Sequence, residues 1–280
     1  MRIKITADST CDLTPALLAE HDITLTSLIV IKNDQEYYDG ETITPADIFD
    51  HVAAGGSLCS TAARSVGYYQ DVFEKFSAEY DGVVHISIGS GFSSSYQNAC
   101  LAAEEFDNVR VIDSQNLTTG QGFIVLEAAK LAKTCTSLDE LEQKLIDFSS
   151  RVEVSFVLNQ LDYMVKGGRC SAAAALGANL LNLKPCIEVK DGKLGVVKKY
   201  RGSYSKCLTT YIKDRLEGRD NLSSDLVFVT STPVSPEDHA LVMDTIRKYG
   251  KFDNIIETAA GCTVSCHCGP GTLGIIFVRN

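Results

Sequence analysis

The 280-residue sequence lacks any uninterrupted apolar run of the roughly 18 residues that a membrane-spanning helix needs. It also lacks the apolar block of a secretory signal peptide, because polar and apolar side chains alternate along residues 1–6. We therefore expect a cytoplasmic protein that makes at most transient contact with a membrane. The 10 cysteines are scattered, and in that compartment we expect reduced thiols, often buried as small hydrophobic side chains.

An excess of basic residues is also missing. The chain has 26 Lys and Arg against 36 Asp and Glu, which gives a formal net charge of −10. Proteins that bind the nucleic-acid backbone usually carry the opposite excess, so we expect no nucleic-acid partner. With 45% hydrophobic and 22% charged residues, the composition is that of a globular protein with a buried core.

Motifs of several common enzyme classes are absent. No Gly-Lys-Ser/Thr occurs, so ATP is not bound through a Walker A loop, and no Gly-x-Ser-x-Gly marks a serine hydrolase. Residues 269–274 match Gly-x-Gly-x-x-Gly formally. A strand-like run follows them, whereas the dinucleotide motif requires a helix, so we take the match as accidental.

The first half of the chain has the rhythm of an open α/β sheet. Short β-branched runs at residues 83–88 and 109–112 are typical of buried parallel strands, and each precedes a polar turn and a helical stretch. A capping box at Ser137 and Glu140 predicts a helix to about residue 148, and residues 154–158 would form the next strand. Three further helix starts combine a hydroxyl side chain with proline: Thr14 and Pro15, Thr44 and Pro45, Ser235 and Pro236.

The pattern changes after residue 158. An Ala-rich helix is predicted over residues 171–181, and a hairpin around Asp191 and Gly192 introduces antiparallel pairing. We predict an N-terminal α/β domain over residues 1–160, with an open and mostly parallel sheet between helices. A smaller C-terminal α+β domain with an antiparallel sheet would cover residues 161–280.

Two hydroxyl clusters are candidate binding elements. Residues 87–96 join a predicted strand to a predicted helix, where the Ser93 hydroxyl and free backbone N–H groups suit a phosphate or a carboxylate. Thr61 lies in a second cluster, at residues 60–65, before the helical stretch 68–80. The Ser93 loop could equally be a helix cap, and the Thr61 cluster taken alone is best interpreted as one.

The segment 262–271 brings together Cys262, Cys266, His267 and Cys268. A structural zinc site needs a second pair of ligands at a distance in the sequence, and no such pair is evident, so we predict no metal. If the segment is extended, Cys266 and Cys268 share a face and His267 points away. His267 is either a polar donor beside the Gly-Pro-Gly turn or a structural residue.

Together, these segments resemble the DegV family of bacterial fatty-acid-binding proteins, which includes the fatty-acid-binding subunit of fatty acid kinase. The match runs nearly end to end, and its strength is the order and spacing of motifs that are weak one by one. They are residues 7–13, 61–65, 90–97, 111–114, 161–169, 183–185, 201–202 and 267–271.

The resemblance implies a fatty acid in a tunnel between the two domains. Its carboxylate would be held by the Thr61 and Ser93 hydroxyls, the Ser94 backbone N–H and His267. It further implies a cytoplasmic carrier without a cofactor or catalytic residues, which presents the acid to an ATP-using kinase subunit that makes acyl phosphate for phospholipid synthesis. Arg169 and Arg201 match family arginines and would serve partner docking, phosphate approach or structural ion pairs.

The sequence departs from the family pattern at several of these positions. Ala62 and Arg64 replace the second hydroxyl and the proline of a Thr-Ser-x-Pro-Ser motif, which puts the shape of that loop in question. Ser94 replaces a usual glycine, and Cys266 and Cys268 replace two threonines around His267. Thiols are weaker donors than hydroxyls, so either the polar coverage of the head group or the sensitivity to oxidation would differ here.

Two other classes of function remain open from the sequence. One is a phosphotransferase related in architecture to dihydroxyacetone kinase, which would need a substrate-linking histidine or a carboxylate cluster near residues 90–95. The other is a regulatory protein that senses a lipid and acts through a protein contact. Acyl length, oligomeric state and the residues lining the tunnel cannot be predicted from the sequence.

Overall fold

The computed structural model describes residues 1–174 and 183–280, and three sheets organise this part of the chain. The first sheet has the strand order β2-β1-β6-β7, and all of its neighbouring strands are parallel. Its strands are β1 (Ile3–Asp8), β2 (Ile23–Thr26), β6 (Gly82–Ser87) and β7 (Val109–Asp113). The predicted open parallel sheet is therefore confirmed.

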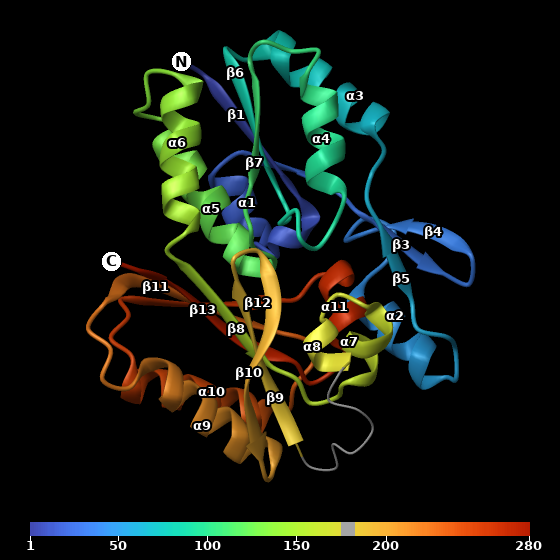
Figure 1. Cartoon of the computed structure of the whole chain (residues 1–280), viewed down its shortest axis with the longest axis vertical. Coiled ribbons are helices and arrows are strands. Elements are labelled where there is room, and N and C mark those ends of the chain that lie inside the picture. Colours follow the sequence, from blue (N-terminus) through green and yellow to red (C-terminus); the bar gives the residue numbers. More distant parts are fainter. Residues whose placement is uncertain (175–182) are drawn as a thin grey trace.

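Helices lie on both faces of this sheet (Figure 1). Those of the first half are α1 (Pro15–Glu20), α3 (Val66–Glu79), α4 (Ser95–Ala103), α5 (Thr118–Leu131) and α6 (Leu138–Ser149). Buried side chains of α3 and α4 pack with β6 and β7, whereas α5 and α6 pack with β1 and β6 in a different cluster. The parallel strands are thus covered on both sides, as their continuous apolar runs predict.

The second sheet has six strands in the order β10-β9-β8-β13-β11-β12. All of its neighbouring pairs are antiparallel except β11 with β12. The strands are β8 (Val152–Val157), β9 (Leu183–Lys190), β10 (Lys193–Arg201), β11 (Leu222–Ser231), β12 (Asn254–Ala259) and β13 (Leu273–Arg279). The predicted hairpin forms between β9 and β10, and Asp191 and Gly192 in its turn have φ angles of 51° and 67°.

The strand β8 corrects one expectation. The sequence places it in the first sheet, but β8 pairs with β13 and β9 in the second sheet. The apolar side chains of β8 suit either sheet, so the composition of the strand does not indicate which sheet it joins. The boundary near residue 160 remains a prediction, whereas the pairing of β8 is a property of the structure.

Helices α9 (Tyr204–Leu216) and α10 (Pro236–Tyr249) cover one face of the six-stranded sheet, and α5 lies against the other face (Figure 1). Phe123 of α5 packs edge-on against Phe228 of β11, with 4.8 Å between ring centroids. Nearby, the hydroxyl oxygens of Thr119 and Thr230 are 2.6 Å apart. The two sheets therefore share one core through α5.

A third sheet of three antiparallel strands lies to one side, and the sequence gives no prediction for it. Its strands are β3 (Ile29–Lys32), β4 (Gln35–Tyr38) and β5 (Ser60–Ala62), in the order β4-β3-β5. Short helices gather around it in Figure 1: α2 (Pro45–Ala53), α7 (Asp162–Gly167), α8 (Ser171–Ala174) and α11 (Cys262–Cys268). The predicted helix over 171–181 is described only as far as Ala174, and its remainder lies outside the described residues.

The predicted helix starts are confirmed with one change in detail. Thr14, Thr44 and Ser235 each accept a hydrogen bond from a backbone N–H in the first turn of the helix that follows. Ser137 caps α6 by accepting from the Glu140 N–H, but the Glu140 carboxylate accepts from Thr136 and not from Ser137. In a capping box the Glu140 carboxylate would accept from the Ser137 N–H, whereas here it accepts from Thr136.

The Cys262–Cys268 segment is a helix, so its predicted extended form is wrong. The start of this helix, α11, is bound by carboxylates from the first half of the chain. Asp39 accepts from the backbone N–H groups of Cys262 and Thr263 at 2.9 and 3.1 Å, and Asp12 accepts from that of Gly261 at 3.0 Å. These distant carboxylates satisfy N–H groups that have no partner within a helix, a contribution that local sequence patterns do not reveal.

We predict that Asp39→Asn destabilises the protein by about 2–4 kcal/mol, because buried hydrogen bonds to a charged acceptor are lost. Asp39 is 4% exposed and also accepts from the hydroxyls of Ser9 and Thr263. Urea unfolding measures the change. Asp71→Asn is the matched control, because Asp71 is exposed on α3, and its unfolding free energy should change by less than about 0.5 kcal/mol. Equal effects of the two substitutions would contradict the assignment.

Candidate functional site

A cavity of about 720 Å³ lies between the sheets and is lined by residues from both halves of the chain. Much of its wall is apolar, and its polar groups include Thr61, Ser93 and His267. The apolar lining consists of Leu28, Ile29, Ala62, Ala63, Ile88, Phe92, Leu117, Phe156, Met164, Leu194 and Val264. Such a cavity suits a ligand with a long apolar part and a small polar part.

Thr61 and His267 meet in this cavity although 206 positions separate them in the sequence. Thr61 Oγ1 is 2.8 Å from His267 Nε2, a hydrogen-bond distance. Thr61 lies on β5, and His267 lies near the end of α11, which packs against β5 and α2. The pairing depends on the carboxylate contacts that attach the start of α11 to the first half of the chain.

Ser93 and Ser94 line the same cavity from the loop between β6 and α4. Ser93 Oγ accepts from the Ser95 N–H at 3.1 Å and is 2.9 Å from Ser95 Oγ. Among the described residues, no acceptor is found for the backbone N–H groups of Ser93 and Ser94. These donors and the Ser93 hydroxyl are therefore available to an anion at the start of α4.

The turn of the β9–β10 hairpin packs against this loop. A side-chain carbon added at Gly91 would lie 2.2 Å from the Gly192 carbonyl oxygen, so no residue larger than glycine fits without movement. On the other side of the loop, Ser90 donates from its N–H and hydroxyl to Asp113 at 3.0 and 2.6 Å. The loop is thus held between the first sheet and the second.

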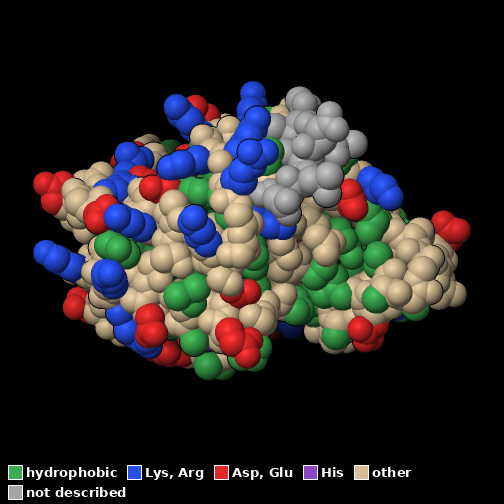
Figure 2. All heavy atoms as spheres, turned by 90° about the horizontal axis from the view of Figure 1, so that it is seen from below, with side chains coloured by type: hydrophobic (Ala, Val, Ile, Leu, Met, Phe, Trp, Pro, Cys, Tyr) green, Lys and Arg blue, Asp and Glu red, His purple; other side chains and the backbone are tan. Residues whose placement is uncertain are grey.

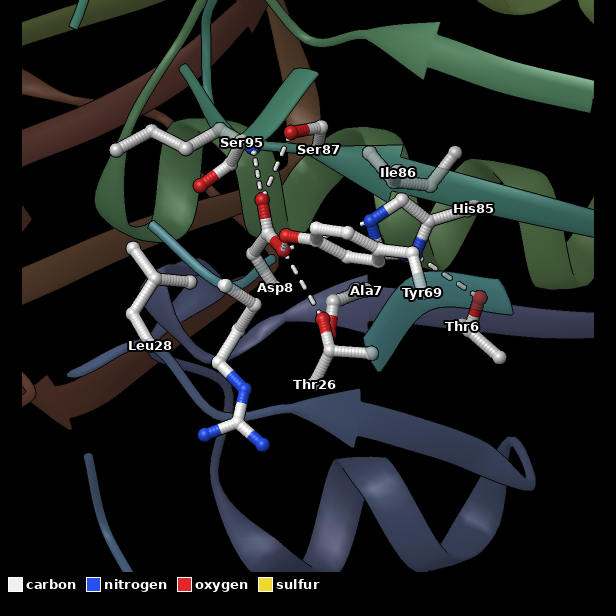
Figure 3. Close-up of polar contacts among 12 residues, drawn as sticks. Thr6, Ala7, Asp8, Thr26, Leu28, Tyr69, His85, Ile86, Ser87 and Ser95 are labelled. Atoms are coloured by element: carbon white, nitrogen blue, oxygen red, sulfur yellow. Dashed lines mark hydrogen bonds and ion pairs between the residues drawn. The ribbon is translucent and has the colours of Figure 1, made fainter. Parts of the chain in front are cut away.

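A buried polar network supports the same loop from below (Figure 3). Asp8, at the end of β1, accepts from the hydroxyls of Tyr69, Thr26 and Ser87 at 2.7, 2.9 and 2.8 Å. Burial acts to raise the pKa of Asp8, but its interaction with His85, whose Nε2 is 3.4 Å away, and the hydrogen bonds it accepts hold that pKa below its usual value. The Asp8 carboxylate is therefore ionised.

This network reaches the cavity through Tyr69. The Tyr69 hydroxyl donates to Asp8 at 2.7 Å, and Tyr69 also interacts with Ser95, whose hydroxyl oxygen is 2.9 Å from that of Ser93. Because Asp8 can only accept, the single proton of the Tyr69 hydroxyl is committed to it. A row of polar side chains therefore runs from the ionised Asp8 to the cavity wall, although the sequence shows Asp8 only as a polar residue after a strand.

His267 is a neutral side chain at physiological pH. Burial lowers its pKa to about 4, and the nearby positive charge of Arg169 adds to this effect. Its second ring nitrogen, Nδ1, is buried and has no hydrogen-bond partner among the described residues. A side-chain carbon added at Gly167 would lie 2.4 Å from Nδ1, so glycine there allows the ring its place.

The loop after Thr61 keeps a defined shape without the family proline. Asn98 of α4 donates to the Arg64 carbonyl oxygen at 2.7 Å, and the Arg64 guanidinium lies over the Tyr68 ring, 3.6 Å from its centroid. Ser65 caps α3 by accepting from the Tyr68 N–H. Arg64 also lines the cavity, a role that its place in the family motif does not predict.

The two candidate arginines lie in different places. Arg169 lines the cavity and is exposed to solvent, and its guanidinium donates to the Gly167 carbonyl oxygen at 2.9 Å. Arg201 is exposed at the end of β10 and does not line the cavity. Figure 2 shows Lys and Arg side chains gathered on part of the lower face of the molecule, despite the negative net charge.

The described residues contain no cluster of three or more His, Cys, Asp and Glu side chains placed to hold a metal ion. Within the same part of the chain, no helix is both long and apolar enough to cross a membrane. The polar groups on the cavity wall include hydroxyls, backbone N–H groups, a neutral imidazole and the guanidinium groups of Arg64 and Arg169, beside one acidic side chain, Glu36. All of these except Glu36 can donate hydrogen bonds to an oxyanion such as a carboxylate.

Several residues at the cavity are missed by sequence reasoning. Phe92 follows the glycine of the Ser/Gly loop, and Met164 and Leu194 lie on elements that the sequence does not connect with the site. Each looks like an ordinary core residue in the sequence. These side chains line one cavity because the two halves of the chain pack against each other in the folded protein.

Comparison with known proteins is consistent with this arrangement. Residues 2–280 match the family described as uncharacterised protein, DegV family. A DegV domain-containing protein of Clostridium acetobutylicum is 30% identical over 283 residues, which cover 100% of this chain and 99% of that protein. A similar protein of Clostridium perfringens is 29% identical over 284 residues, with the same coverage.

Solved structures agree with the fold. The structure reporting fatty acid binding of a DegV family protein from Thermus thermophilus is 28% identical, with a TM-score of 0.90 and full coverage of both chains. A stearic acid-binding protein from Eubacterium ventriosum is also 28% identical, with a TM-score of 0.85, 99% coverage of this chain and 98% of that one. With a family match over nearly its whole length, this chain belongs to the DegV family.

Proposed function

We propose that this protein binds one long-chain fatty acid in the cavity between its sheets. The observation that carries the proposal is the meeting of Thr61, Ser93 and His267 in a cavity that also has a substantial apolar wall. The two similar solved structures that are described as binding fatty acids support the same class of ligand. The carboxylate would lie among these donors, and the acyl chain along the apolar lining.

The acyl chain supplies most of the binding free energy. Burial stabilises by roughly 0.8 kcal/mol per CH₂, so a sixteen-carbon chain contributes on the order of 10 kcal/mol before the costs of association. The cavity volume of about 720 Å³ falls within the usual range for ligand sites. Burying the carboxylate is costly unless donors replace its water, which is the role of the polar end.

The neutral imidazole determines which protons face the ligand. Because His267 is neutral, it carries one ring proton, and with that proton on Nε2 it donates to Thr61 Oγ1. The Thr61 hydroxyl then keeps its own proton for the carboxylate. Ser93 does the same, since its oxygen already accepts from the Ser95 N–H. The Ser94 N–H completes a set of three donors.

The first test is direct identification of the ligand. We expect native purification under reducing conditions, followed by denaturing extraction and mass spectrometry, to release a stoichiometric fatty acid. Thr61→Ala combined with Ser93→Ala should weaken binding of a fatty acid by at least 10-fold. The affinity for its methyl ester should change by less than 3-fold, because the ester lacks the anionic head group that these donors bind.

Ser223→Ala is the control for this comparison, because Ser223 lies on β11, partly buried and outside the cavity lining. Its affinity for both ligands should equal that of the unmodified protein. Equal losses for acid and ester in the double variant would contradict the carboxylate assignment. An empty protein that takes up no fatty acid from a panel of chain lengths would contradict the proposal as a whole.

The His267 ring offers a second prediction, on pH. Its pKa is about 4 in the folded protein and about 6.5 when the chain unfolds. The unfolded state therefore binds more protons between these values, and the contribution of His267 to stability is complete above pH 6.5 and is lost as the pH falls toward 4. NMR titration of the ring protons, assigned by comparison with His267→Gln, should give a midpoint near 4 without ligand.

Addition of saturating fatty acid should move this midpoint upward, because a carboxylate close to the ring favours its charged form. The Thr61→Ala, Ser93→Ala double variant, which binds the acid weakly, should show a smaller upward movement at the same ligand concentration. A ligand-free midpoint near 6.5 would mean that the ring is exposed to water, contrary to its position in the structure.

We further propose that the bound acid is presented to a separate ATP-dependent kinase subunit for acyl-phosphate formation, which feeds phospholipid synthesis. Family resemblance and the lack of a Walker A motif support a carrier that relies on another protein for ATP. The exposed Arg169 at the cavity is suited to an anionic group on an approaching partner.

We expect acyl phosphate to form only when this protein, ATP and a kinase subunit are combined. Arg169→Ala should lower the rate at least 10-fold while changing fatty-acid affinity less than 3-fold, because its guanidinium faces solvent. Lys133→Ala, distant from the cavity lining, is the control and should keep the full rate. Acyl phosphate made by this chain alone would instead identify it as an enzyme.

A further inference from the structure

A second cavity, of about 380 Å³, adjoins the Thr61–His267 pair. Thr61, Arg169 and His267 line both this cavity and the larger one. The second cavity differs because two thiols, those of Cys59 and Cys266, also belong to its lining. The proposed carboxylate site therefore has a fatty-acid cavity on one side and a dithiol cavity on the other.

The two thiols come from the same two segments that bring Thr61 and His267 together. Cys59 precedes β5 by one residue and Thr61 by two, and residues two apart in an extended segment share a face. Cys266 directly precedes His267 on α11. The segments thus meet twice, once through Thr61 and His267 and once through Cys59 and Cys266, which pack in one buried cluster.

The two thiols lie on the wall of one cavity and in one buried cluster, where they interact with each other. This contact lowers the pKa of Cys59 to about 7 despite burial, with help from the positive charge of Lys32. The same contact and burial raise the pKa of Cys266, which therefore keeps its proton and acts as the donor. A substantial fraction of Cys59 is the reactive thiolate near neutral pH.

Several of the other cysteines are less suited to oxidation. Burial raises the pKa of the thiols of Cys11, Cys186, Cys262 and Cys268 to about 12 or above. Cys100, which is partly exposed on α4, also has a raised pKa, mainly through burial. Cys59 alone among the ten cysteines combines a lowered pKa with a place on a cavity wall and a neighbouring thiol.

We propose that Cys59 and Cys266 form a peroxide-sensitive dithiol, and that its oxidation to a disulfide weakens ligand binding at the adjoining Thr61–His267 pair. The modifying reagent is hydrogen peroxide or an organic hydroperoxide, and the cavity has room for several molecules the size of water. The disulfide goes beyond the proposed function, whereas its effect on fatty-acid affinity rests on that function.

The reaction takes place in two balanced steps. The Cys59 thiolate attacks one oxygen of hydrogen peroxide, the O–O bond breaks, and the departing hydroxide takes a proton to leave as water, which gives a sulfenic acid on Cys59. Cys266 then attacks the Cys59 sulfur, the S–O bond breaks, and the thiol proton leaves with the hydroxyl group as a second water. Two thiols lose two electrons in total, and one peroxide accepts them.

The bond requires the two segments to move. Two sulfur atoms that are not bonded to each other lie farther apart than the roughly 2.05 Å of a disulfide. Forming the bond draws β5 toward α11. This movement changes the relative positions of Thr61 and His267, whose bonding atoms are now 2.8 Å apart. The hydrogen-bond donors of the carboxylate site would then no longer be positioned to bind the carboxylate of the ligand.

The first experiment locates the bond in the full-length protein. After treatment with about one equivalent of hydrogen peroxide and blocking of free thiols, non-reducing peptide mapping should find Cys59 joined to Cys266. Dithiothreitol should restore both thiols. Cys59→Ser and Cys266→Ser should each abolish the cross-linked peptide, and Cys100→Ser should leave it unchanged. Oxidation that stops at Cys59 or occurs mainly at other cysteines would overturn the dithiol.

The second experiment measures ligand affinity in protein shown to be fully cross-linked. Fatty-acid affinity should fall about 10-fold on oxidation and recover on reduction, and peroxide should leave the affinity of Cys59→Ser unchanged. A cross-linked protein with unaltered affinity would overturn the proposed effect on binding. If neither form binds a fatty acid, the proposed function fails, while the peptide map still decides whether the disulfide forms.

Discussion

The binding of the α11 start by carboxylates of the first half is the interaction on which the site depends. Asp39 and Asp12 accept from three successive backbone N–H groups, at Gly261, Cys262 and Thr263. The helix is only seven residues long, so fixing its start also fixes the position of His267 near its end. Burial and the neighbouring Asp39 raise the pKa of Asp12 to about 8.

The sequence predicts those parts of the fold that depend on local patterns. The hydroxyl-proline helix starts, the parallel strands and the hairpin at Asp191 and Gly192 all follow from residues close together in the chain. The assignment of β8 fails for a physical reason, since an apolar strand carries no mark of which partner it will pair with. The helical form of residues 262–268 is also missed, because the groups that satisfy its first N–H groups are more than 200 residues away.

The candidate site, like the fold, is predictable from the sequence only where it depends on local motifs. Thr61, Ser93, Ser94 and His267 are candidates from the residues and the family resemblance, and the structure brings all four to one cavity. Two features of the site could not be predicted, because each joins segments that are distant in the sequence. One is the support of the Ser93 loop by Asp8 through Tyr69 and Ser95. The other is the close approach of Gly91 to the hairpin turn. The apolar lining is hidden for another reason: in the sequence, a cavity wall and a solid core have the same composition.

The position of β8 affects how the two halves of the chain can be separated. A fragment ending near residue 160 would contain β8 without β13 and β9, which supply its hydrogen-bonding partners on both sides. A fragment beginning there would leave β13 and β9 with unpaired edges where β8 belongs. Unpaired strands of this kind invite association with other chains. The two halves are therefore interdependent folding units, and a gene fusion or a split of this protein would need to keep β8 with the C-terminal half.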